Sequence, residues 1–167
     1  MRIQLSNNFY LDEFTYSQTA VRHGIKIEVP ENSIQFLRLK ALCTTVLQPL
    51  RDHLGRPITI TSGYRPEEVN RLIGGSSNSQ HIQCLAGDYV VPGMDTIDVC
   101  RAVIALKLPF DQLINEFGRW VHVSIAANPG QERGEVLTAY KFRPVVGSPR
   151  TRYEPGLHLA DQLEASA

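Results

Sequence analysis

The sequence has few cysteines, no excess of either charge and no long apolar run. Its three cysteines form no Cys-x-x-Cys pair, and this favours reduced thiols over a secreted disulfide framework. Seventeen acidic residues balance seventeen basic ones, so the electrostatic footprint of a nucleic-acid-binding protein is missing and no such partner is expected. No apolar run approaches the ~20 residues that span a bilayer, so no membrane insertion is expected.

The composition that remains is that of an ordinary globular protein. Hydrophobic residues make up 43% of the 167 positions and charged residues 20%, which suits one domain with a sizeable core. We expect this domain to span residues 1–143. After Arg143, prolines and glycines are scattered among charges, and the pattern predicts an irregular C-terminal tail over 144–167, with at most a short helix over 157–163.

Apolar periodicity and turn residues predict a mixture of helices and strands. A helix over 34–54, capped by Asn32 or Ser33 and stopped at Gly55, should kink or break near Gln48 because Pro49 follows. The other expected elements are a helix or turn over 11–20, helices over 66–73 and 95–106, and strands over 58–61, 85–91, 111–116, 119–125 and 136–142. Hairpin connections between strands predict an α+β fold, a mainly antiparallel central sheet with flanking helices.

Two histidines and one aspartate form a candidate metal site. His81 and Asp88 are seven residues apart, and His122 follows in Trp120-Val121-His122. Two imidazoles and one carboxylate are the protein ligands of an open catalytic zinc site, which keeps a fourth position for water. We therefore expect one Zn²⁺. The remaining histidines, His23, His53 and His158, lie in no comparable motif.

The residues around these ligands resemble the zinc D-alanyl-D-alanine carboxypeptidase family, within the wider group of peptidoglycan peptidases that includes the hedgehog signalling domain. The motifs occur in the family's order: Thr61-Ser62-Gly63-Tyr64-Arg65-Pro66, Val69-Asn70, Gly74-Gly75, Ser79-Gln80-His81, Ala86, Asp88 and Trp120-Val121-His122. The resemblance covers about residues 9–124. It implies the hedgehog/D-Ala-D-Ala peptidase-like fold and a peptidase whose metal ligands are His81, Asp88 and His122.

One position in the central signature differs from the family. Cys84 stands where a glycine is usual. It could be a fourth ligand or a redox-sensitive thiol, but a small residue filling the place of the glycine is the preferred interpretation. Trp120 is interpreted as a packing residue.

The general base is the residue that the resemblance settles least. Many relatives place a Glu or Asp three residues before the second histidine, where this chain has Arg119, which stays protonated and cannot act as a base. Glu116 is the nearest acidic residue upstream, and a tight turn at Phe117-Gly118 would fold it back across from Arg119. We expect Glu116 to be the base; the alternative is a cross-strand Glu116–Arg119 ion pair without catalytic duty.

Three further residues are expected to contact the substrate. By resemblance, Arg65 stabilises charge on the scissile carbonyl or on the terminal carboxylate, and a guanidinium is suited to either. The alternative is a turn arginine that pairs with Glu67 or Glu68. Ser79 and Gln80 are expected to donate hydrogen bonds to the substrate or to orient His81.

These expectations combine into a zinc peptidase that hydrolyses the peptide stems of bacterial peptidoglycan. The most specific version is a D-alanyl-D-alanine carboxypeptidase; an endopeptidase cutting an L-alanyl–D-glutamate or cross-link bond is a close variant. A non-catalytic module that binds peptidoglycan or a partner protein is the alternative from another class. The first residues lack the apolar core of a signal peptide. We therefore expect a protein of the bacterial cytoplasm that reaches the wall after lysis, through a holin or as part of a virion, as a bacteriophage endolysin does.

Overall fold

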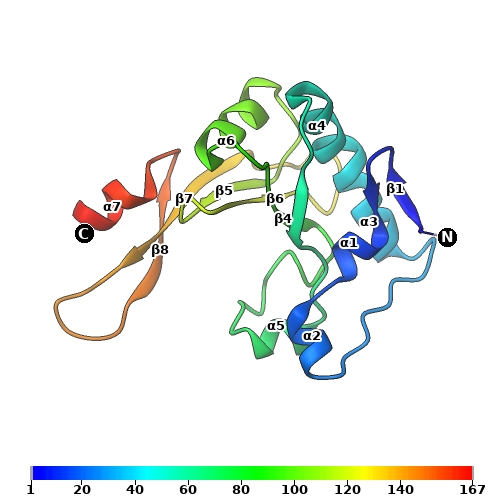
Figure 1. Ribbon diagram of the computed structural model, residues 1–167, viewed down its shortest axis with the longest axis horizontal. Coiled ribbons are helices and arrows are strands. Elements are labelled where there is room, and N and C mark those ends of the chain that lie inside the picture. The colour runs from blue at the N-terminus through cyan, green and yellow to red at the C-terminus, as the bar shows by residue number, and fades with distance from the viewer. Residues whose placement is uncertain (1, 167) are drawn as a thin grey trace.

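The computed structural model describes residues 2–166, which form two small sheets and a set of short helices (Figure 1). The helices are α1 (Leu11–Thr15), α2 (Gln18–Arg22), α3 (Ile34–Leu42), the π-helix η1 (Cys43–Leu47), α4 (Gln48–Leu54), α5 (Glu67–Leu72), α6 (Thr96–Ala105) and α7 (Ala160–Ser166). The strands are β1 (Gln4–Ser6), β2 (Phe9–Tyr10), β3 (Thr59–Ser62), β4 (Ala86–Val90), β5 (Gln112–Glu116), β6 (Trp120–Ser124), β7 (Glu135–Phe142) and β8 (Arg150–Pro155).

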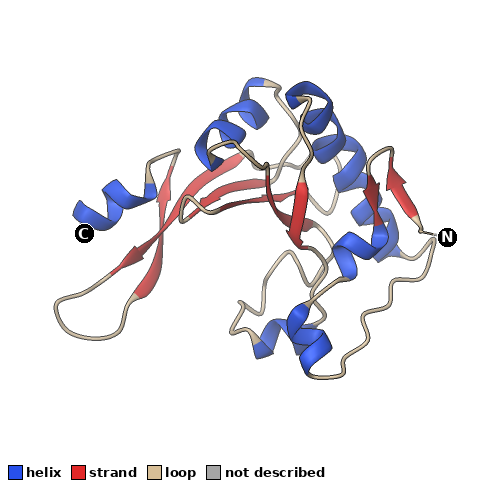
Figure 2. Ribbon diagram, viewed as in Figure 1, coloured by secondary structure: helices blue, strands red, loops and turns tan. Residues whose placement is uncertain are grey.

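The central sheet has six strands in the order β3-β4-β6-β5-β7-β8. Its one parallel pair is β5 with β7, and the other four pairs are antiparallel. Figure 2 shows helices around this sheet, and β1 pairs with β2 in a separate hairpin beside it. The expected fold, an α+β domain with a mainly antiparallel sheet and flanking helices, is confirmed.

The two faces of the central sheet have different roles. Successive side chains of a strand point to opposite faces. Tyr89, Val121 and Val123 point to one face and belong to the main hydrophobic core with α3, η1, α4 and α6. Asp88, next to Tyr89, and His122, between Val121 and Val123, point to the other face. The core therefore supports the strands from one side, and the polar residues meet on the opposite side.

The long helical segment is interrupted next to its proline. Ser33 Oγ accepts a hydrogen bond from Phe36 N, so Ser33 is the N-cap that was expected. Pro49 lies in the first turn of α4, directly after η1, where Gln48 N donates to Cys43 O. Proline lacks an N–H and its ring crowds the carbonyl four residues back, so the wider π turn relieves the clash. Among residues 2–166, no helix is long and apolar enough to cross a membrane.

The C-terminal segment is more regular than the sequence indicated. β8 pairs with β7 along its whole length: Leu137 is opposite Pro155 at one end and Phe142 is opposite Arg150 at the other. Figure 1 shows α7 following β8 at the end of the described chain. Thr138, buried in β7, donates through Oγ1 to Gly156 O and accepts from His158 N. The expectation of an irregular tail is wrong for these residues, because β7 offers an open edge that β8 completes. The domain boundary at 143 stays a prediction.

Candidate metal centre

His81 is held in a series of tight turns between α5 and β4. Its ring is 2% exposed, and its Nδ1–H donates to the carbonyl oxygen of Gly63 at 2.7 Å. Its own carbonyl oxygen accepts from Arg65 N at 3.2 Å. Because Nδ1 carries the proton, the lone pair of Nε2 is free to face the sheet. A backbone carbonyl that fixes the tautomer in this way is typical of metal-binding histidines.

Asp88 and His122 meet this nitrogen from two neighbouring strands. They are directly opposite each other in the β4–β6 ladder. His122 Nδ1 lies 2.8 Å from Asp88 Oδ1, and His81 Nε2 lies 3.1 Å from the same oxygen and 3.2 Å from His122 Nδ1. Three atoms that carry lone pairs thus converge in a buried place, where only a shared proton or a cation can satisfy them together.

The chemistry of this donor set fits zinc. Two imidazole nitrogens and one carboxylate oxygen suit a borderline metal that takes three protein ligands. Burial alone would raise the pKa of Asp88, but the two histidines beside its carboxyl group outweigh burial and hold the pKa well below its usual range. The carboxylate is therefore ionised, as a metal ligand must be. Within residues 2–166 this is the one group of histidine, cysteine and acidic side chains with such an arrangement.

Glu116 lies on the same face of the sheet as His122. Phe117 and Gly118 both have positive φ, 57° and 64°, and Arg119 N donates to Glu116 O at 2.9 Å, as in a type I′ turn. This turn places Glu116 opposite Trp120, two residues from His122. From the sequence, we expected Glu116 to lie opposite Arg119. The expected register of this hairpin was therefore wrong by one residue. Among the described residues, Arg119 forms no ion pair with Glu116 and its side chain is exposed.

The electrostatic surroundings of Glu116 are those of a proton carrier. Burial raises the pKa of Glu116 to about 7; His122, Arg65 and Lys141 lower it, and the negative charge of Asp88 raises it. These groups act on the carboxyl because they surround the same face. A carboxyl with a pKa near neutrality can both accept and release a proton at ordinary pH.

Arg65 approaches the same place from the segment after β3. Its Nη2 donates to Ser79 Oγ at 3.4 Å, and in the described part of the chain its buried Nε has no hydrogen-bond partner. Burial lowers the pKa of Arg65, while the charges of Asp88 and Glu116 raise it. Among residues 2–166, no ion pair joins Arg65 to Glu67 or Glu68. The guanidinium therefore lies within electrostatic range of Asp88 and Glu116, and its hydrogen-bond partner is Ser79 rather than an acidic residue of its own turn.

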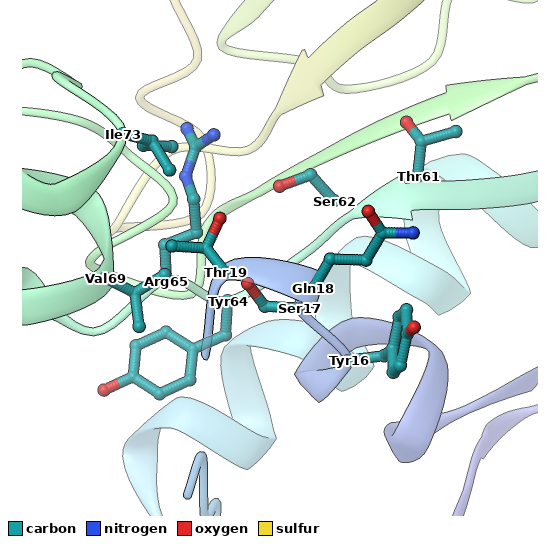
Figure 3. A pocket seen from close by; sticks show the side chains of 10 residues that line it. All are labelled: Tyr16, Ser17, Gln18, Thr19, Thr61, Ser62, Tyr64, Arg65, Val69 and Ile73. Carbon is teal, nitrogen blue, oxygen red and sulfur yellow. The ribbon is translucent and has the colours of Figure 1, made fainter. Parts of the chain in front are cut away.

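A polar pocket of about 280 Å³ opens beside Arg65. Figure 3 shows Val69, Ile73 and the Arg65 guanidinium on one side of it and Thr61 and Gln18 on the other. The full lining is Tyr16, Ser17, Gln18, Thr19, Thr61, Ser62, Tyr64, Arg65, Val69 and Ile73. Most of these side chains carry a hydroxyl, an amide or a charge, so the pocket suits a ligand rich in hydrogen-bonding groups.

Comparison with protein-family models assigns this arrangement to a family. The model described as Peptidase M15 matches residues 7–124. The chain belongs to the Peptidase M15 family. Its members are zinc-dependent metallopeptidases, and the match spans all three candidate ligands together with Arg65 and Glu116. Comparison with curated proteins gave no match.

In this M15 peptidase, the residue that replaces the usual glycine keeps the backbone conformation of a glycine. Cys84 has φ of 59°, in the left-handed region, and its side chain is fully buried in the core. Burial raises the pKa of its thiol to about 12. A thiol that stays protonated is a poor metal ligand, and Cys84 is not part of the cluster that His81, Asp88 and His122 form. This geometry supports the packing interpretation.

Gln80 and Ser79 serve the loop that carries His81. The Gln80 amide donates to Asp111 Oδ2 at 2.8 Å, and Asp111 in turn binds the guanidinium of Arg133. The side chain of Gln80 therefore ties the His81 loop to the start of β5, which favours the orienting role over the expected substrate contact. Ser79 accepts from Arg65 and positions it beside the metal cluster.

Two contributors to the M15 site were missed in the sequence. The first is the carbonyl of Gly63, whose place in the Ser-Gly-Tyr-Arg motif was a usable signal for a close backbone approach. The second is the Asp111–Arg133 pair, since Arg133 follows β6 in a loop with no recognisable pattern. The expected packing role of Trp120 stays a prediction; its ring lies against Phe117, with centroids 5.4 Å apart.

Proposed function

We propose that this M15 metallopeptidase uses zinc to hydrolyse the peptide stems of bacterial peptidoglycan, most specifically as a D-alanyl-D-alanine carboxypeptidase. One observation carries the proposal. The buried cluster of His81, Asp88 and His122 lies on the same face of the sheet as a carboxyl whose pKa is near neutrality, Glu116. A set of metal ligands alone shows only where a metal would bind, whereas ligands plus a proton carrier fit a hydrolase.

The residues of the chain divide the work of hydrolysis among them. His81, Asp88 and His122 would hold a zinc ion, which when bound would supply the Lewis acidity that activates water and polarises a carbonyl. The Glu116 carboxylate takes a proton from the attacking water and passes it to the nitrogen of the leaving amine. The Arg65 guanidinium stabilises the negative charge that develops on the scissile carbonyl oxygen, or binds the terminal carboxylate.

The pocket beside Arg65 supports a small and polar substrate. It is lined by hydroxyl groups and an amide, with Val69 and Ile73 as its apolar members. A D-alanine has only a methyl side chain, so it needs little apolar lining, while its carboxylate and amide need hydrogen-bond donors and a cation. Arg65 and the hydroxyls of Ser17, Thr19 and Ser62 provide this chemistry. We assign the leaving D-alanine to this pocket.

The test is turnover of a panel of synthetic stem peptides followed by mass spectrometry, with and without a chelator. The panel contains a peptide that ends in D-Ala-D-Ala, one with an internal L-Ala–D-Glu bond and a cross-linked dimer. We expect release of one terminal D-alanine, loss of activity on chelation and recovery with Zn²⁺. Cleavage of only the internal or the cross-link bond would assign the endopeptidase variant instead.

A variant pair tests the role of Glu116. Glu116→Gln should keep the fold and the zinc content but lower kcat by ~10²-fold or more, because it removes a general base. Glu154→Gln is the matched control, since Glu154 is exposed and points to the opposite face of β8 from Tyr153. Turnover of Glu116→Gln at the wild-type rate would place the base elsewhere. A zinc-loaded wild type that binds the peptides without cleaving any of them would establish the non-catalytic module.

A further inference from the structure

β8, which lies outside the segment that matches the family model, reaches the face of the candidate active site. β5 pairs with β7 so that Glu116 is level with Ala139, and β7 pairs with β8 so that Ala139 is level with Tyr153. Residues that are directly opposite each other in a ladder point to the same face. Glu116, Ala139 and Tyr153 therefore form one row across three strands.

The middle residue of this row leaves room for the outer two to approach each other. Adjacent strands are about 4.8 Å apart, so the backbones of Glu116 and Tyr153 are roughly 10 Å apart. Between them stands only the methyl group of Ala139, which is 0% exposed. A methyl group is short, so it leaves space into which the longer side chains on either side can extend.

The charges of the site act on the phenol of Tyr153. Burial raises the pKa of Tyr153, and the negative charges of Glu116 and Asp88 raise it further. Both carboxylates thus act on the phenol, although four strand pairings separate β8 from the strand of Asp88. The hydroxyl stays protonated at neutral pH and is a hydrogen-bond donor.

The ring of Tyr153 does not fill a core position. It is 52% exposed, whereas Tyr140, the neighbouring tyrosine on β7, is 7% exposed and points to the other face. A tyrosine that is half open to solvent and lies near two carboxylates is placed to meet a ligand rather than to support the fold.

We propose that Tyr153 is a substrate-binding residue, whose phenol O–H donates a hydrogen bond to a carbonyl oxygen on the acyl side of the scissile peptide bond. The proposal rests on the proposed function. The pocket beside Arg65 adjoins β3, at one edge of the central sheet, and Tyr153 lies on β8, at the other edge. A stem peptide whose leaving D-alanine occupies the pocket extends its acyl part across the metal ligands toward Tyr153.

The experiment compares Tyr153→Phe, Tyr153→Ala and Tyr140→Phe with the wild type. The substrate is the D-Ala-D-Ala-terminated stem peptide, and the readouts are kcat, KM, zinc content and thermal midpoint. The affinity of the metal-free protein for the same peptide, measured by calorimetry, provides a readout that does not depend on activity. We expect Tyr153→Phe to weaken this affinity and to lower kcat/KM by about 5–10-fold, mainly through KM, as the loss of one hydrogen bond predicts. Tyr153→Ala should lose at least as much, and Tyr140→Phe should change neither KM nor peptide affinity.

Three results would overturn the assignment. Wild-type KM and affinity in Tyr153→Phe would show that the hydroxyl does not contact substrate, while turnover by the wild type would leave the proposed function intact. Loss in Tyr153→Ala but not in Tyr153→Phe would show that the ring only covers Ala139. A wild type that neither binds nor cleaves any stem peptide would remove the proposed function and this assignment together.

Discussion

Glu116 is a residue of the candidate active site on which electrostatic influences of opposite sign act. Its burial and the charge of Asp88 favour the protonated carboxyl, while His122, Arg65 and Lys141 favour the carboxylate. The result, a pKa of about 7, is well above the ordinary value of 4.5. This balance affects the stability of the fold as well as the chemistry of the site.

The raised pKa predicts how the stability of the metal-free protein depends on pH. Between about pH 4.5 and 7 the native state keeps a proton on Glu116 that the unfolded chain has released, so this contribution to stability falls as pH rises. Gln cannot ionise, so Glu116→Gln lacks this loss. The free energy of unfolding of the variant should therefore increase relative to that of the wild type by on the order of 2 kcal/mol between about pH 5 and pH 8.

Urea unfolding of chelator-treated wild type and variant at both pH values measures this difference. Titrating groups that do not interact with Glu116 contribute equally to both proteins and cancel in the comparison. Glu154→Gln, at an exposed position, should show the same pH dependence of the free energy of unfolding as the wild type. Parallel behaviour of Glu116→Gln as well would contradict a raised pKa at Glu116.

Cys84 combines a left-handed backbone with a buried side chain, and this predicts an unusual order of variants. Cys84→Gly removes more atoms than Cys84→Ala but relieves a conformation that costs non-glycine residues roughly 1–2 kcal/mol. We expect Cys84→Gly to be at least as stable as Cys84→Ala in chemical unfolding, and both to keep zinc and activity. Loss of stoichiometric zinc in both variants would instead identify the thiol as a ligand.

At the scale of residues, short motifs predicted the metal cluster and its neighbours. Positions that depend on how strands pair could not be predicted in the same way. His81, Asp88 and His122 were found because each has a characteristic flank, and the structure brings the three side chains together. The expected partner of Glu116 was wrong by one position. The sequence predicts a turn at Phe117-Gly118, but it does not determine which residues pair across that turn. The sequence around Tyr153 did not indicate a site residue, since Tyr153 is brought to the site only by the pairing of β8 with β7.

Among the elements, α1 and the end of β3 make a close backbone contact that bears on the metal cluster. A Cβ at Gly63 would lie 2.5 Å from both Cα and the carbonyl oxygen of Phe14. Tyr64 N donates to that same carbonyl oxygen at 2.7 Å. Only glycine lets the two backbones come this close, and Gly63 O is the acceptor that orients His81.

Gly63→Ala should therefore weaken metal binding without touching a ligand. We expect α1 and β3 to move apart, at a cost of about 1–3 kcal/mol in the free energy of unfolding. Zinc affinity should fall about 10–100-fold, because His81 loses its orienting carbonyl. Competition with a chromophoric chelator measures the affinity.

Gly55→Ala is the control for this variant. Gly55 has a positive φ of 60° and open space around it, so its substitution should cost stability but leave zinc affinity unchanged. Wild-type zinc affinity in Gly63→Ala would show that the carbonyl of Gly63 does not set the affinity of His81.

Element types were predictable where local chemistry decides them and not where distant pairing does. Pro49 predicted an interruption of the 34–54 helix, but not that a π-helix over Cys43–Leu47 would absorb it. That outcome depends on how Val46 and Leu47 pack in the core. β8 was missed because Arg150–Pro155 has no buried face to give it an alternating pattern; its pairing with β7 defines it.

For the whole molecule, the metal cluster joins parts of the chain that are far apart in sequence. His81 belongs to a loop, while Asp88 and His122 belong to paired strands. Ligand binding to the native state alone stabilises it by about 4 kcal/mol at a thousandfold excess over Kd. Removal of zinc should therefore lower the thermal midpoint by roughly 10 °C for a protein of this size.

Calorimetry of the zinc-loaded and the chelated protein measures that shift. His81→Ala should show no further drop on chelation, whereas His23→Ala, changed at an exposed histidine away from the cluster, should respond like the wild type. An unchanged midpoint in the chelated wild type would contradict zinc binding by the native state.

The position of β8 at the edge of the sheet has a consequence for self-association. All six of its residues are exposed, and its outer N–H and C=O groups face no other strand among the described residues. Such an edge can template the addition of a strand from another chain, which leads to aggregation. Arg150 and Arg152 place positive charge along it, and Pro155 at its end has no N–H to donate. Glu154 offsets one of these two arginines, so a net positive charge together with the proline disfavours pairing between two identical edges.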